Sequence, residues 1–362
     1  MKLLLSLAIV LSATSAFATR ARVQALGNAA HLVDSSTVYM KPADIFAVSD
    51  SVTIESGLTA TTPATGTTSA SGTEALVIRS MGDAKWALSL GHDDETVLAQ
   101  RAGANSIAGF TGGVSQQNPF ELTYGMKAGD LAWAATLAYS NFNNKVAESK
   151  ESTTNVKFGA ATSSWDASVD LGVMSKTESG TGTTKDEFKG KSNVAVRGGY
   201  WVSSDMYTYG EVVNGGFEVT NGPAAAVEVK NQAIKIGAIN TMKNDGNEFF
   251  WGAAIESTQV KVDDAKDTSL SLPFIIGLEA NAASWLTLRG SITQNVLIQN
   301  EKSDNGTATT AELAPGLNST AFAAGAGLKL GKLSLDGSLL ANNTQTVNSA
   351  NLLGTVGLTY AF

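Results

Sequence analysis

The chain has 362 residues, a formal net charge of −8 and no cysteine. The acidic balance argues against nucleic acid as a partner, and the lack of cysteine excludes disulfide frameworks, catalytic thiols and thiolate metal sites. Glycine is abundant (36 residues), proline is scarce (6), and only 16% of residues are charged, which is low for a soluble surface. This composition favours twisted strands over collagen-like or disordered sequence.

Residues 1–18 have the pattern of a secretory signal peptide. Lys2 precedes an apolar run from Leu3 to Leu11, and small residues follow up to Ala16-Phe17-Ala18. The run is too short for a bilayer of about 30 Å, so we expect cleavage after Ala18 rather than a membrane anchor. Later segments lack the ~18 consecutive apolar residues of a transmembrane helix. An exported chain of this kind is expected to be periplasmic, secreted or in the outer membrane.

Residues 19–46 precede the first predicted strand. They read A-R-V-Q-A-L-G at 21–27, are acidic around Asp34, and continue with K-P-A at 41–43. This segment resembles the N-terminal part of FadL-type outer-membrane transport barrels, although Lys41 stands where that family has Asn. The resemblance implies a hatch inside a barrel lumen. A periplasmic lead-in to the first strand is the alternative, and both remain open.

From residue 47 the chain alternates between segments of period two and polar connections, which predicts β-strands. The connections alternate between short turns of Gly, Asn, Asp and Ser and longer polar loops. A parity change between Val229 and Ile234 predicts a bulge. The sixteen predicted strands are 47–58, 74–80, 84–92, 119–127, 130–142, 151–160, 163–175, 191–201, 204–214, 227–241, 247–261, 268–280, 284–299, 319–330, 332–342 and 351–362.

Alternating apolar and polar faces suit a soluble sandwich or, turned inside out, a membrane barrel. The export signal, the sorting of short and long connections, and strands near the ~9–11 residues that cross a bilayer favour the barrel. The predicted fold is therefore all-β: a transmembrane antiparallel β-barrel over residues 47–362, with short periplasmic turns and long extracellular loops. Its predicted location is the outer membrane of a Gram-negative bacterium.

The last twelve residues, N-L-L-G-T-V-G-L-T-Y-A-F, alternate apolar and small or polar positions and end at Phe362. They resemble the closing strand of Gram-negative outer-membrane barrels, porins among them, and we expect them to pair with strand 47–58. All six tryptophans lie within a few residues of a short turn, which predicts an aromatic girdle at the periplasmic interface. The predicted girdle comprises Trp86, Trp133, Trp165, Trp201, Trp251, Trp285, Tyr360 and Phe362.

Placing the polar faces inward predicts a lumen of mixed charge, seven groups of each sign. These groups either orient polar solutes or pair to hold the wall together. Loop 93–118 is the candidate constriction loop through Asp93, Asp94, Glu95 and Arg101, and a surface loop is its alternative. The candidate pore-lining residues are Arg79, Lys85, Glu121, Lys127, Lys157, Asp166, Asp170, Arg197, Glu256, Glu279, Arg289, Lys329 and Asp336, with Glu55 of the same parity.

The porin resemblance implies passive diffusion of small hydrophilic solutes, ions included, through a water-filled lumen. A FadL-like channel for hydrophobic substrates and a structural barrel with a blocked lumen are the alternatives. We expect no enzyme, cofactor or metal: of the two histidines, His31 and His92, only His92 lies beside carboxylates, and no Ser motif accompanies it. The expected partners are outer-membrane lipid and lipopolysaccharide, the barrel assembly machinery and small solutes. A homotrimer, as in general porins, and a monomer, as in FadL-type barrels, both fit.

Overall fold

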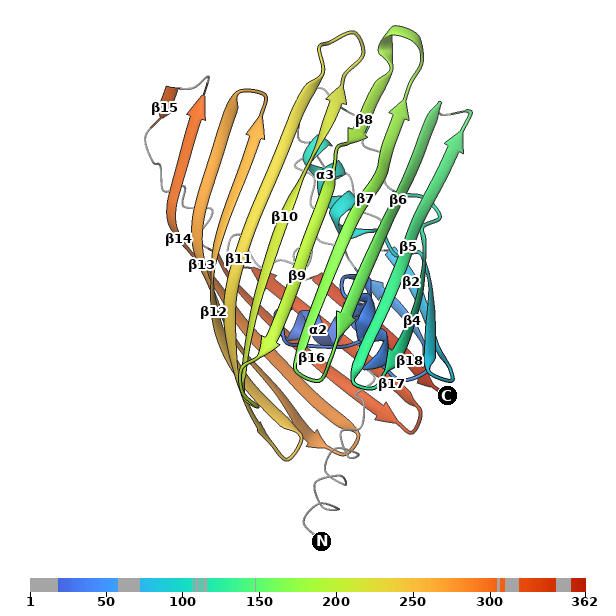
Figure 1. Ribbon diagram of the computed structural model, residues 1–362, viewed down its shortest axis with the longest axis vertical. Helices are drawn as coiled ribbons and strands as arrows, with labels where there is room; N and C mark the ends of the chain where they lie inside the picture. The colour runs from blue at the N-terminus through green and yellow to red at the C-terminus, as the bar shows by residue number, and fades with distance from the viewer. Residues whose placement is uncertain are drawn as a thin grey trace.

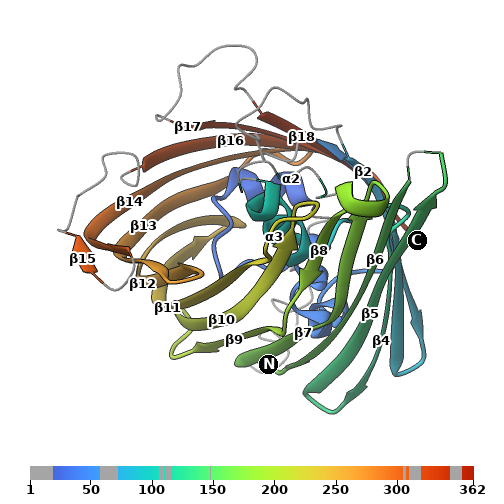
Figure 2. The ribbon, with the colours of Figure 1, turned by 90° about the horizontal axis from the view of Figure 1, so that it is seen from above.

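The computed structural model describes residues 19–57, 72–105, 107, 110, 112, 116–146, 148–304, 307–309, 319–342 and 353–362. The predicted signal peptide, residues 1–18, lies outside them. The described strands form one antiparallel sheet that closes on itself around a filled interior (Figures 1 and 2). None of the helices in this part of the chain has the length and hydropathy to span a membrane.

The strands follow the chain around the barrel. They are β1 (Ser51–Gly57), β2 (Gly72–Met81), β3 (Ala84–Leu90), β4 (Phe120–Ala128), β5 (Leu131–Asn144), β6 (Ser149–Ala161), β7 (Trp165–Ser179), β8 (Asp186–Gly190), β9 (Asn193–Trp201), β10 (Met206–Thr220), β11 (Val227–Asn244), β12 (Asn247–Val262), β13 (Ala265–Ala283), β14 (Leu286–Asp304), β15 (Thr307–Thr309), β16 (Ser319–Leu330), β17 (Leu333–Asn342) and β18 (Leu353–Ala361). The helices are α2 (Arg20–Ala25), η1 (Ser36–Tyr39), η2 (Pro42–Phe46), α3 (Glu95–Asn105) and η3 (Gly182–Thr184).

These eighteen described segments occupy sixteen positions around the barrel. β8 and β9 both lie between β7 and β10, and β15 and β16 both pair with β14. The circle closes at β1, where Ser51 is opposite Ile78 of β2 on one side and Ala361 of β18 on the other. The predicted sixteen-position antiparallel barrel and its closing pair are confirmed.

Two local predictions were wrong. The predicted loop 262–267 is a tight turn at Asp263 and Asp264, because Val262 still pairs with Ala265 and Asp263 adopts a positive φ of 49°. The predicted bulge in 227–241 does not exist: β11 pairs with β10 and β12 in unbroken register. Val229 and Ile239 both face inward there, since the interior offers them apolar partners.

The outward positions of the strands form an exposed apolar belt. Ile234, Ile236, Ile255, Ile276 and Ile292 are each 46–66% exposed. Such side chains would be unfavourable against water over so large an area, so the belt needs an apolar environment around the barrel. Seen from above, the strands run around the interior, which contains α2 and α3 (Figure 2).

The predicted girdle rings fall into two groups. Trp133, Trp251 and Trp285 are 44–52% exposed, as are Tyr360 and Phe362, and Trp86 and Trp165 share the outward parity with partial exposure. Trp201 is a correction. It is opposite Tyr207, which is only 2% exposed, so both rings face inward. Tyr200, 52% exposed, occupies the outward position instead. The alternation of this strand was misread because its inner face also carries an aromatic ring.

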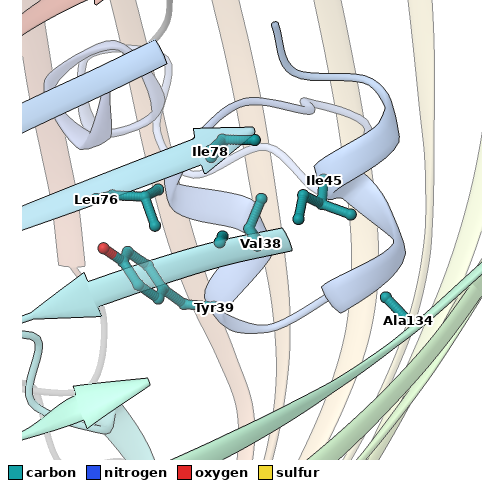
Figure 3. Close-up of a cluster of buried hydrophobic side chains, with 7 residues drawn as sticks. Val38, Tyr39, Ile45, Leu76, Ile78 and Ala134 are labelled. Carbon is teal, nitrogen blue, oxygen red and sulfur yellow. The ribbon is translucent and has the colours of Figure 1, made fainter. Parts of the chain in front are cut away.

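The interior is packed around residues 19–46, which we call the hatch. Val38, Tyr39 and Ile45 of the hatch pack against Leu76 and Ile78 of β2 (Figure 3). A second cluster joins Val23, Leu26 and Leu32 to Ile239 and Phe250 on the opposite wall. A third joins Ala104 and Phe110 to Phe188, Phe217 and Val219 at the end with the longer connections. The lumen therefore contains packed apolar clusters, as the core of a soluble protein does.

The closing strand makes one testable contribution to assembly. The backbone N–H of Phe362 donates to Asp50 O (3.1 Å), and the Arg79 guanidinium lies 4.7 Å from the Phe362 ring centre. Deleting Phe362 removes a contact at the seam where the free edges meet, so we expect a several-fold lower yield of heat-modifiable, folded barrel with unchanged conductance per folded molecule. Phe322→Ala, which removes an equally exposed outward ring (50%) away from the seam, is the control. Normal insertion without Phe362 would contradict its assembly role.

Candidate lumenal site

The hatch crosses the lumen from one wall to the other. α2 contacts β14, β16, β17 and β18, whereas η2 contacts β3, β4, β5 and β6. After α2 the chain turns at Gly27 (φ +66°), where a Cβ atom would lie 2.9 Å from Ile275 Cδ1, so glycine allows the close approach to β13. This placement agrees with the hatch and not with a periplasmic lead-in.

Arg22 anchors the hatch to one wall. Its Nε donates to Glu279 Oε2 (2.7 Å), and Arg289 Nε donates to the same oxygen (2.6 Å). Arg289 also reaches Asp336 Oδ1 (2.5 Å), and Asp34 of the hatch lies 3.9 Å from Arg22 Nη1. Burial raises the pKa of Asp34 despite the neighbouring guanidinium. These five groups form a sealed network between hatch and barrel.

Lys41 and Asp44 hold the middle of the hatch. Lys41 Nζ lies 2.9 Å from Asp166 Oδ1 of β7, and the Tyr207 hydroxyl donates to Asp166 Oδ2 (2.5 Å). Thr37 Oγ1 donates to Asp44 Oδ2 (2.5 Å), and burial raises the pKa of Asp44 to about 6 even though Lys41 opposes the shift. The residue that departs from the FadL-type pattern, Lys41, is therefore an ion-pair partner of the wall.

His92 lies where hatch, wall and loop meet. Its ring stacks on Tyr39 of the hatch with centroids 3.6 Å apart. Its Nδ1 lies 2.8 Å from Glu74 Oε2 and 3.0 Å from Arg20 Nη2, and its Nε2 lies 3.7 Å from Glu121 Oε1. The side chain is only 2% exposed. His92 therefore links structural elements and is shielded from solutes.

The described helix of the predicted constriction loop, α3, lies inside the barrel (Figure 2). Asp94 caps α3 by accepting from the backbone N–H groups of Thr96 (3.1 Å) and Val97 (3.2 Å). Burial alone would raise the pKa of Asp94, but the Lys157 ammonium 2.9 Å away lowers it to about 2. Arg101 pairs with the fully buried Glu151 (2.8 Å).

The two other charged residues predicted for this loop are Asp93 and Glu95. Asp93 is partly buried, and burial raises its pKa. The Glu95 side chain lies outside the described set.

Most candidate pore-lining residues face inward and are paired. Lys85 donates to Val48 O, Lys157 lies 3.3 Å from Glu121, and Asp170 is buried close by. Glu55 accepts from the backbone N–H of Arg20 (2.5 Å). The charges that the sequence places in the lumen thus mainly hold the filled interior together. Arg197, Glu256, Glu279, Arg289 and Asp336 also point inward.

One of these predictions needs correction. Arg79 lies on the outward face, because Leu76 and Ile78 turn inward to pack on the hatch (Figure 3). Lys127 and Lys329 have the inward parity and are exposed beside the short turns. The rule that the polar face points inward fails at β2 because the lumen there is apolar.

The interior leaves one large cavity in the described part, about 710 Å³, between the hatch and strands β9–β14. Val23, Leu32 and Ile239 line it with apolar surface, and Tyr207 and Tyr209 contribute rings. Four charged residues also reach it from neighbouring strands: Arg197, Glu211, Lys235 and Glu256. The combination of apolar surface and a few charged groups is typical of a small-molecule site.

The wall beside the cavity is irregular. The ladder between β12 and β13 pairs Ala253 with Phe274 and Glu256 with Ser271, but skips the two positions between them. Pro273 lies in that gap and has no N–H to donate. A register shift follows between Leu270 and Ser271 on the β14 side. This is the least regular stretch of wall that lines the cavity.

A closed sheet with an exposed apolar exterior satisfies its backbone hydrogen bonds in lipid, which an open sheet cannot do. The protein is an outer-membrane β-barrel. No protein-family model and no curated protein sequence matches the chain. Among the described residues, no group of three or more His, Cys, Asp or Glu is arranged to hold a metal ion.

Solved structures with a similar fold are also outer-membrane barrels. A bacterial polysaccharide outer membrane secretin has a TM-score of 0.47 and 9% identity, over 86% of this chain and 97% of the other. A porin has a TM-score of 0.43 and 8% identity, over 86% and 99%. CdiB from Acinetobacter baumannii has a TM-score of 0.45 and 6% identity, over 87% of this chain and only 60% of CdiB. At such identities the likeness concerns the fold alone.

Sequence reasoning missed four residues of this outer-membrane barrel's cavity: Tyr207, Tyr209, Glu211 and Lys235. The segment 204–214 alternates ambiguously, since β10 carries tyrosines inward and Val212 outward. The supposed bulge in β11 likewise hid the inward parity of Lys235. The available signal was the opposite-charge pairing across neighbouring strands, which becomes readable only once register is known.

Proposed function

We propose that this barrel transports small solutes across the outer membrane through the cavity beside its hatch. The cavity carries the proposal, because the hatch and α3 lie inside the barrel and a space of about 710 Å³ is left between the hatch and strands β9–β14. Sixteen strands alone would enclose a wide aqueous channel. The sequence predicts free diffusion of hydrophilic solutes through an open lumen. Because the hatch lies in the lumen, we expect their diffusion to be restricted instead.

A second candidate is a channel for hydrophobic substrates that leave sideways into the membrane. The observation that favours it is the interrupted ladder at Pro273 next to the apolar part of the cavity. The two candidates differ in where the solute exits. One substitution separates them. Pro273→Val restores an N–H to the ladder and should slow only lateral exit.

Filling the cavity tests the main proposal. Ala30 of the hatch lines the cavity and is partly exposed, so Ala30→Phe places a ring in the passage. We expect solute flux into proteoliposomes to fall several-fold, with heat-modifiable folding retained. Ala135→Phe makes the same change on an outward position of β5 and serves as control. Equal flux in Ala30→Phe and the intact barrel would contradict a route through the cavity.

A further inference from the structure

We infer that the cavity binds small zwitterions with an apolar body, and that an extended peptide of about three apolar residues has the matching length. This inference rests on the proposed function and specifies its substrate class. It derives from the four charged residues of the cavity wall, which we call the charge row: Arg197, Glu211, Lys235 and Glu256.

The charge row alternates in sign across four consecutive strands. Glu211 of β10 is directly opposite Arg197 of β9 on one side and Lys235 of β11 on the other, and Lys235 is opposite Glu256 of β12. Arg197 Nε donates to Glu211 Oε1 (2.7 Å), and Lys235 Nζ lies 3.3 Å from Glu256 Oε2. The row is neutral overall, so a lone anion or cation meets attraction and repulsion in turn, whereas a zwitterion of the right length gains at both ends.

The ends of the row keep unused hydrogen-bonding capacity. The Arg197 side chain is 17% exposed, its Nε donates to Glu211, and its buried Nη1 has no hydrogen-bond partner. An incompletely used guanidinium fork fits a carboxylate. At the other end Glu256 is 30% exposed, and its two carboxylate oxygens can accept more donors than Lys235 supplies. A carboxylate at Arg197 and an ammonium at Glu256 therefore complete the row.

The exposure of the row separates it from the charges that merely hold the wall. Arg289 and Asp336 are 5% and 2% exposed, and Arg289 also shares Glu279 with Arg22 of the hatch. The side chains of that network are largely buried. The charge row faces open cavity volume instead, with side chains 17–33% exposed. A purely structural pair would gain little from such exposure, since solvent weakens it.

Geometry sets the length of the ligand. Three strand spacings of roughly 4.8 Å separate Arg197 from Glu256, about 14 Å in all. An extended peptide of three residues spans about 10 Å and reaches both groups with one hydrogen bond of about 2.8 Å at each end. Its side chains would then lie against the apolar lining from Val23, Leu32, Ile239 and Ile275.

The test measures the binding of trileucine to the full-length barrel in detergent by calorimetry. Four forms are compared: free termini, acetylated amine, amidated carboxylate and both blocked. Because each charged hydrogen bond is worth about tenfold or more, blocking either end should raise Kd about tenfold. Dileucine, which is too short for both ends, should bind like a singly blocked trileucine.

Substitutions assign each end to its residue. Arg197→Gln should abolish the preference for a free carboxylate over its amide and keep the preference for a free amine, and Glu256→Gln should do the reverse. Lys230→Gln, in an exposed pair with Glu228 on β11 outside the cavity, should leave both preferences intact. If a variant fails to fold, the four peptides on the unmodified barrel still decide the matter.

The outcomes distinguish this inference from the proposed function. Equal affinity for free and doubly blocked trileucine, or no binding while other solutes still cross the barrel, would overturn the zwitterion site and leave transport standing. If no solute crosses the intact barrel, the proposed function fails first.

Discussion

Deleting residues 20–46 is expected to convert a barrel of low conductance into a wide pore in planar bilayers. The hatch contacts strands on both sides of the lumen, and its removal leaves sixteen strand positions around an interior that water can fill. The pore should also become cation-selective. Glu74 and Asp166 lose their hatch partners Arg20 and Lys41 and present negative charge to the pore, whereas Glu279 loses Arg22 but keeps Arg289.

Conductance steps and the reversal potential in a salt gradient measure both effects. Selectivity should weaken at high salt, where screening shortens the range of these charges. The triple variant Arg20→Gln, Arg22→Gln, Lys41→Gln retains the hatch chain without its cations and separates the plug from its charges. Unchanged conductance after deletion would show that residues 20–46 do not limit the passage.

How far the sequence predicts this fold depends on which face of a strand is considered. Outward faces such as Leu335 and Leu339 of β17 alternate cleanly because lipid demands apolar side chains at every second position. Strand number, closure and the pairing of β1 with β18 follow from that periodicity and from the turns. They required no knowledge of the interior.

The inward faces could not be assigned by the same rule. Leu76 and Ile78 point inward because Val38 and Ile45 cover them, and Val229 does so because Phe217 is its neighbour. These partners lie on other segments of the chain, so no pattern within one strand reveals them. The misplacement of Arg79, the inward Trp201 and the supposed bulge in β11 share one cause: a filled lumen accepts apolar side chains that an open, water-filled lumen would exclude.

The position of the hatch in the lumen could not be predicted from local sequence either. Arg22 and Glu279 are 257 positions apart. Lys41 and Asp166 form an ion pair only because the hatch lies inside the closed barrel. The sequence resemblance suggests a lumenal segment, but charge and spacing within 19–46 do not distinguish it from a periplasmic lead-in. The position follows from the ion pairs of the hatch cations Arg20, Arg22 and Lys41 with carboxylates of the barrel wall.

Glu279→Ala is expected to release the hatch far more often than any other single substitution in its anchor. Glu279 lies between Arg22 of the hatch (2.7 Å) and Arg289 of β14 (2.6 Å), with 14% of its side chain exposed. Without it two largely buried guanidinium groups face each other. Removing one partner of a buried ion pair costs about 3–5 kcal/mol. If that cost falls on the seated hatch, its detachment becomes about 100-fold to 4,000-fold more frequent.

Arg22→Met should have a smaller effect, and this asymmetry tests the mechanism. Glu279 then still has Arg289 as its partner, although Asp34 loses Arg22, and the methionine retains much of the apolar contact of the arginine stem. Single-channel recordings of open probability give the comparison. Glu228→Ala, which breaks an exposed pair with Lys230, is the control and should not change the recordings. Equal opening of Glu279→Ala and Arg22→Met would mean that the loss of the hatch contact itself, rather than the loss of the carboxylate that both arginines share, drives release. A silent Glu279→Ala barrel would mean that the packing of Val23, Leu26 and Leu32 against Ile239 and Phe250 is sufficient to hold the hatch.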